Sequence, residues 1–103
     1  MANVTVFVGA RPYLLTEQEA RRLAQLLRVA FADEKTEEAA AGLRLAWALG
    51  LVVDEGLDEP LEIGWPQAEA VIRAVPEVTA HAYDGLEVLL QAARRLADDA
   101  PQD

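Results

Sequence analysis

The chain has 103 residues, and its 18 carboxylates outnumber nine lysines and arginines to give a formal net charge of −9. It contains no serine and no cysteine, which excludes Ser and Cys nucleophiles, disulfides and thiolate metal sites. Such an acidic surface repels phosphate backbones, so direct nucleic-acid binding is not expected.

The length fits one compact domain. Apolar residues make up 52% of the chain but aromatic residues only 6%, which favours a core of Ala, Leu and Val between closely packed helices. We predict a single α+β domain over residues 1–103, with four helices and a small sheet of two to four short strands built on an N-terminal β-hairpin. The last few residues are expected to be frayed.

The N-terminus has the pattern of a hairpin. Residues 4–8 (VTVFV) contain branched apolar residues in alternation and predict a strand. Residues 9–12 (GARP) favour a turn, and residues 13–15 predict a second strand that pairs with the first. The alternative is a single strand that runs through a loop into the first helix.

Two capping signals predict the first two helices. Thr16 and Glu19 form a capping box, so a helix should begin there and end near Ala32. Thr36 is the next predicted N-cap. It precedes an apolar stretch, residues 39–53, which is shorter than the ~20 residues that a membrane-spanning helix needs.

The stretch 39–53 contains a single charged or polar residue, Arg44. We therefore expect protein to cover this helix on most sides, with Trp47 in the core. Small residues recur every fourth position at Gly42, Ala46 and Gly50, and this spacing predicts a seam where another helix or the sheet approaches closely.

The second half continues with short elements. An acidic turn, residues 54–60, leads to a brief strand at residues 61–63. Pro66 fits the first turn of a third helix that ends before Pro76. Residues 78–83 then alternate as a strand does.

The final helix should cover residues 85–98. Asp84 and Glu87 have the spacing of an aspartate capping box at its start, and Arg94 and Arg95 lie in its later turns, where cations are favoured by the helix dipole.

The acidic turn is the most obvious candidate for a metal site, because hard cations take several carboxylate oxygens. Its spacing lacks the alternating ligands of an EF-hand loop. A solvated turn is the favoured interpretation, and no metal or cofactor is expected.

His81, Tyr83 and Asp84 form the one place where a group that titrates near neutral pH has polar neighbours in sequence. If residues 78–83 form a strand, His81 and Tyr83 share a face and line a pocket with Arg11 and Tyr13, where the imidazole acts as a general base. The favoured alternative is structural: His81 at the surface, Tyr83 at the rim and Asp84 as a cap.

Candidate interaction residues lie elsewhere. Trp65 follows Gly64 and is interpreted first as a hydrophobic staple and second as an exposed anchor for a partner. The helix over residues 39–53, with Trp47 and its small residues, is a candidate surface for self-association, as is the final helix. This possibility is weighed equally against cover by the rest of the domain.

The resulting functional hypothesis is a non-catalytic, protein-binding or self-associating small acidic domain. Its sharpest form is an inhibitor, immunity-type or accessory protein steered electrostatically to a basic enzyme. The alternative is a small enzyme or ligand-binding domain with a pocket near His81, Tyr83 and Arg11. A partner protein or a second copy is expected, but no nucleic acid and no membrane. The N-terminus does not resemble a signal peptide, so a cytoplasmic location is the default.

Overall fold

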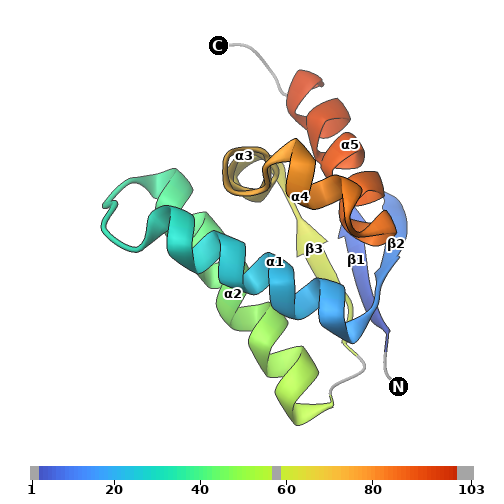
Figure 1. Ribbon diagram of the computed structural model, residues 1–103. Coiled ribbons are helices and arrows are strands. Elements are labelled where there is room, and N and C mark those ends of the chain that lie inside the picture. The colour runs from blue at the N-terminus through green and yellow to red at the C-terminus, as the bar shows by residue number, and fades with distance from the viewer. Residues whose placement is uncertain (1–2, 57–58, 100–103) are drawn as a thin grey trace.

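The computed structural model describes residues 3–56 and 59–99 and has an α+β fold (Figure 1). In chain order its elements are β1 (Val4–Val8), β2 (Arg11–Leu15), α1 (Glu17–Phe31), α2 (Glu37–Glu55), β3 (Leu61–Ile63), α3 (Trp65–Ala74), α4 (Glu77–His81) and α5 (Asp84–Asp98). The predicted fold class, the N-terminal hairpin and the four long helices are confirmed.

The sheet has the order β2-β1-β3, with β2 antiparallel and β3 parallel to the central strand. The hairpin turn is only two residues long, and Gly9 takes the left-handed conformation (φ 63°) that this turn requires. Arg11 and Pro12, which we expected in the turn, belong to β2 instead. Pro12 fits there because hydrogen-bonded and non-hydrogen-bonded residue pairs alternate along an antiparallel ladder. Pro12 is one position beyond Arg11, which pairs with Val8 next to the turn, so its nitrogen points away from β1.

The core lies between one face of the sheet and the helices. Val4, Val6 and Val8 alternate along β1 and are buried together with Ile63 of β3. The helices gather on this side of the sheet in Figure 1, where α5 contacts both strands of the hairpin. The two-residue period of β1 therefore selects the face that the helices cover.

The first two helix starts are confirmed. The Thr16 hydroxyl accepts from the Glu19 amide at 3.1 Å, and the Glu19 carboxylate accepts from the Thr16 amide at 2.8 Å. At the start of α2 the Thr36 hydroxyl accepts from the Ala39 amide at 3.1 Å. Each hydroxyl satisfies a backbone donor that has no partner within its helix.

The cover of α2 is less complete than the sequence suggested. This helix packs mainly against α1 and α3. Its outer side faces solvent, and Trp47, which we expected in the core, is 66% exposed. Apolar residues lie around more of this helix than its neighbours cover, so one side of α2 stays exposed.

The segment predicted as a strand at residues 78–83 is helical and forms α4 (Glu77–His81). Its first turn is closed by a 2.9 Å hydrogen bond from the Ala80 amide to the Pro76 carbonyl, and Ala80 is buried. The apparent alternation depended on alanines, which favour helices over strands.

The predicted aspartate cap of the last helix is also wrong. Tyr83 occupies the N-cap position of α5 without a side-chain hydrogen bond, and Asp84 is the first helical residue. The Gly85 amide donates instead to the carboxylate of Glu19, which reaches it from α1. A distant side chain thus replaces the local cap.

Candidate functional site

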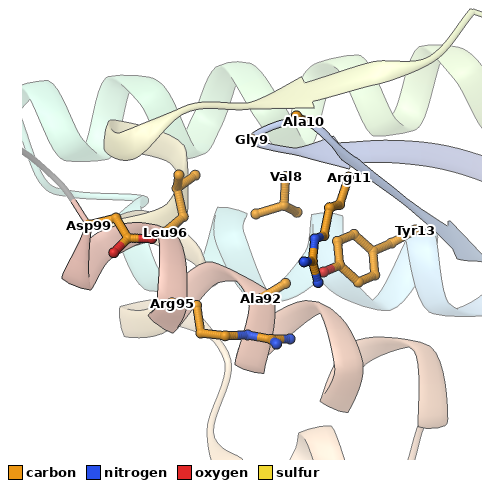
Figure 2. Close-up of a pocket in the computed structure, with 9 residues that line it drawn as sticks. All are labelled: Val8, Gly9, Ala10, Arg11, Tyr13, Ala92, Arg95, Leu96 and Asp99. Atoms are coloured by element: carbon orange, nitrogen blue, oxygen red, sulfur yellow. The ribbon is translucent and has the colours of Figure 1, made fainter.

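A cleft of about 340 Å³ opens between the hairpin and the second half of α5 (Figure 2). Its apolar part is formed by Val8 of β1 and by Ala92 and Leu96 of α5. The turn residues Gly9 and Ala10 close one side. The tight turn ends the hairpin beside the second half of α5, and the cleft lies between the two.

Charged and polar side chains border this cleft. Arg11 and Tyr13 are two positions apart on β2, so they project from the same face of the strand. Arg95 of α5 points toward the same end of the cleft, whereas Asp99 lies at the opposite end (Figure 2). Among the described residues, the cleft therefore has a cationic end, an apolar middle and the single carboxylate of Asp99.

The structure brings only part of the predicted pocket together. His81 ends α4, is exposed, and places its Nδ1 3.2 Å from Glu87 Oε1. Neither it nor Tyr83 lines the cleft that contains Arg11 and Tyr13. The prediction assumed a strand, and the helical conformation of α4 separates these residues. Arg95 was not predicted at this site, because sequence spacing does not show which strand a helix residue faces.

A second candidate surface is the outer side of α2. Leu43 is 36% exposed and Trp47 66% exposed, and these two residues lie one helical turn apart. Arg44 is exposed between them, and the half-buried Leu51 lies one turn beyond Trp47. A groove of about 160 Å³ runs beside this side, bordered by residues of α2, β3 and α3: Arg44, Leu45, Ala48, Leu61, Glu62 and Gln67.

The small residues of α2 are used inside the molecule. An added Cβ on Gly42 would lie 2.9 Å from the Phe31 ring and 3.1 Å from the Ala70 Cβ, so glycine permits close packing with α1 and α3. Ala46 is fully buried. Gly50 faces the Arg28 side chain. The predicted seam exists, and Gly42 and Ala46 are buried in it.

Trp65 does not act as a hydrophobic staple. It is the first residue of α3, with Gly64 as the N-cap, so the staple position before the cap belongs to the buried Ile63. Trp65 is 42% exposed. The second predicted role, an exposed anchor for a partner, stays a prediction.

An ion-pair cluster joins the α1–α2 connection to α3. Arg73 donates to Glu34 at 2.8 Å and to Glu38, and its guanidinium lies 5.0 Å from the centre of the Phe31 ring. The hydrogen bonds from Arg73, and secondly from Thr36, lower the pKa of Glu34 below its ordinary value. These side chains pair with one another and link the α1–α2 connection to α3.

Among the described residues no group of three or more His, Cys, Asp and Glu side chains is arranged to hold a metal ion. Asp58 of the acidic turn, like the C-terminal residues predicted to fray, lies outside the described ranges. Within the same ranges no helix is long and apolar enough to cross a membrane. Comparisons with family models, curated proteins and solved structures found no match for this chain.

Proposed function

We propose that this protein is a non-catalytic binding domain whose outer α2 side contacts a partner protein with a basic surface around an apolar patch. The observation that carries this proposal is the exposure of Trp47 in the middle of a long helix, with Leu43 one turn before it. Tryptophan is among the residues most enriched at the energetic centres of interfaces, and neighbouring exposed apolar side chains mark interaction sites.

Charge favours a different partner protein over a second copy. The net charge of −9 opposes the approach of two identical chains. Carboxylates flank the apolar centre of this side: Glu37 at the start of α2, Glu55 at its end and Glu62 in the groove. Within the part of the chain that is described, none of these three forms an ion pair. A rim of this kind attracts a basic partner and accelerates its association at low salt.

The direct test is site-specific photo-crosslinking in cells, with a photoreactive phenylalanine analogue at position 47 and, as the matched control, at position 88. Val88 is also an exposed apolar helix residue, but it lies on α5. We expect one basic protein to be crosslinked from position 47 and not from position 88. Crosslinking only to a second copy would overturn the proposed partner in favour of self-association.

The crosslinked protein is then purified and titrated with the native domain. Trp47→Ala should weaken binding at least about 10-fold, the range of an interface hot spot, and added salt should weaken it further. The control Val88→Ala should leave the affinity unchanged. Equal affinity of the native protein and the Trp47→Ala variant would overturn the proposal.

A further inference from the structure

The cleft between the hairpin and α5 is independent of the proposed protein interface, since no residue of α2 lines it. We propose that it binds a small organic anion, whose carboxylate or phosphate group is held between Arg11 and Arg95. The argument rests on the placement of these two cations, on the shape of the cleft and on the carboxylate at its other end.

Two cations share one end of the cleft in a chain with twice as many acidic as basic residues. Arg21, Arg73 and Arg94 each pair with a carboxylate. Among residues 3–56 and 59–99, Arg11 and Arg95 have no such pair, as is also true of Arg22, Arg28 and Arg44, but only Arg11 and Arg95 line this cleft. Two guanidinium groups directed toward one space repel each other, and an oxoanion between them removes that repulsion.

The donors at this end match an oxoanion in geometry as well as charge. Guanidinium groups present planar N–H forks that fit carboxylate and phosphate oxygens. The Tyr13 hydroxyl is directed toward the same end of the cleft as Arg11 and Arg95, and supplies a third donor (Figure 2). A bound anion would therefore receive hydrogen bonds from both walls of the cleft, one formed by β2 and the other by α5.

The remaining lining limits the rest of the ligand. A volume of about 340 Å³ is at the lower end of the range for ligand pockets, ~300–1,000 Å³, and suits a small molecule. Val8, Ala92 and Leu96 offer apolar contact to its body. Asp99 would repel a second anionic group at the far end, so the ligand carries its negative charge at one end only.

The test is a titration of the ¹⁵N-labelled protein followed by NMR, with benzoate and phenyl phosphate as probes and benzyl alcohol as their neutral counterpart. Saturable shifts are expected at the amides of the hairpin turn and the end of α5, with benzoate, with phenyl phosphate or with both. The comparison of the two anions shows which oxoanion the cleft prefers. No saturation below about 20 mM with either anion, or an equal response to benzyl alcohol, would overturn the proposal.

Substitutions of Arg11 and Arg95 test whether these two residues cause the NMR shifts. Arg11→Gln and Arg95→Gln should each weaken binding at least about 10-fold, as expected for loss of a charge-assisted hydrogen bond. The matched control is Arg28→Gln, because Arg28 is an exposed arginine of α1 outside the cleft. Asp99→Asn should strengthen binding, because it removes the acidic side chain at the far end of the cleft. Unchanged affinity in both cleft arginine variants would show that the shifts report another site.

Discussion

The carboxylate of Glu19, in the first turn of α1, accepts a hydrogen bond from the backbone amide of Gly85, in the first turn of α5, at 2.6 Å. Its other oxygen accepts from the Thr16 amide at 2.8 Å, and only 8% of the Glu19 surface is exposed. One buried carboxylate therefore satisfies backbone donors at the N-termini of two helices, where the helix dipoles favour negative charge.

Replacing this carboxylate should lower stability markedly. For Glu19→Ala we expect a loss of about 2–4 kcal/mol in the free energy of unfolding, because two charge-assisted hydrogen bonds disappear from a buried site. Urea denaturation followed by circular dichroism measures it. The neighbouring Glu17→Ala removes an exposed pair with Arg21 and should cost less than about 1 kcal/mol. Equal losses in the two variants would contradict the role assigned to Glu19.

Gly85 should respond in opposite directions in two backgrounds. An added Cβ would lie 2.7 Å from Glu19 Cδ, so Gly85→Ala should displace the carboxylate and destabilise the native protein. In the Glu19→Ala background the obstruction is gone, and alanine should stabilise the helix by up to about 1 kcal/mol. A double-mutant cycle by urea denaturation tests this coupling. Additive effects would show that the two residues act independently.

The two glycines within α2 should also differ in sign. Gly42→Ala forces a methyl group against the buried Phe31 ring, and we expect a loss of about 1–3 kcal/mol from overpacking. Gly50→Ala meets only the mobile end of the Arg28 side chain, at 3.1 Å, so the higher helix propensity of alanine should stabilise the protein by about 0.5–1 kcal/mol. Thermal and urea denaturation measure both. A stabilising Gly42→Ala would contradict the close contact between α1 and α2.

Arg73 should make stability depend on pH in the acid range. Its hydrogen bond lowers the pKa of Glu34 below the ordinary 4.5, so the unfolded state binds more protons there. The stabilisation that Glu34 contributes is present above about pH 4.5 and is lost as the pH falls through the pKa of Glu34 in the folded state. In the Arg73→Gln variant, an NMR titration should give Glu34 a pKa nearer its ordinary value. The free energy of unfolding should then fall less steeply as the pH is lowered. An unchanged Glu34 titration would contradict this.

The exposure of Trp47 predicts its fluorescence. In Trp65→Phe the remaining Trp47 should emit at a wavelength close to that of the unfolded protein and be quenched readily by acrylamide, because it is 66% exposed. In Trp47→Phe the remaining Trp65, at 42%, should be quenched less. Stronger quenching of Trp65 than of Trp47 would contradict the greater solvent exposure of Trp47 on α2.

The sequence by itself determined the elements whose signals are local. The caps at Thr16 and Thr36 depend on hydrogen bonds between residues three positions apart, so their spacing can be read directly from the chain. The alternation in β1 and the helical period of α1 and α5 likewise specify which side of each element is buried. Where the local signal was ambiguous, in the alanine-containing α4, the prediction was wrong.

Only the tertiary structure decided which surfaces and groups meet. Glu19 and Gly85 are 66 positions apart, and no periodicity relates them. The same holds for Arg11 and Arg95, which meet in one cleft only because α5 packs on the hairpin. The exposure of Trp47 depends on how much of α2 its neighbours cover. The sequence pattern identifies an apolar helix, but how much of its surface other elements cover depends on the packing of the whole chain.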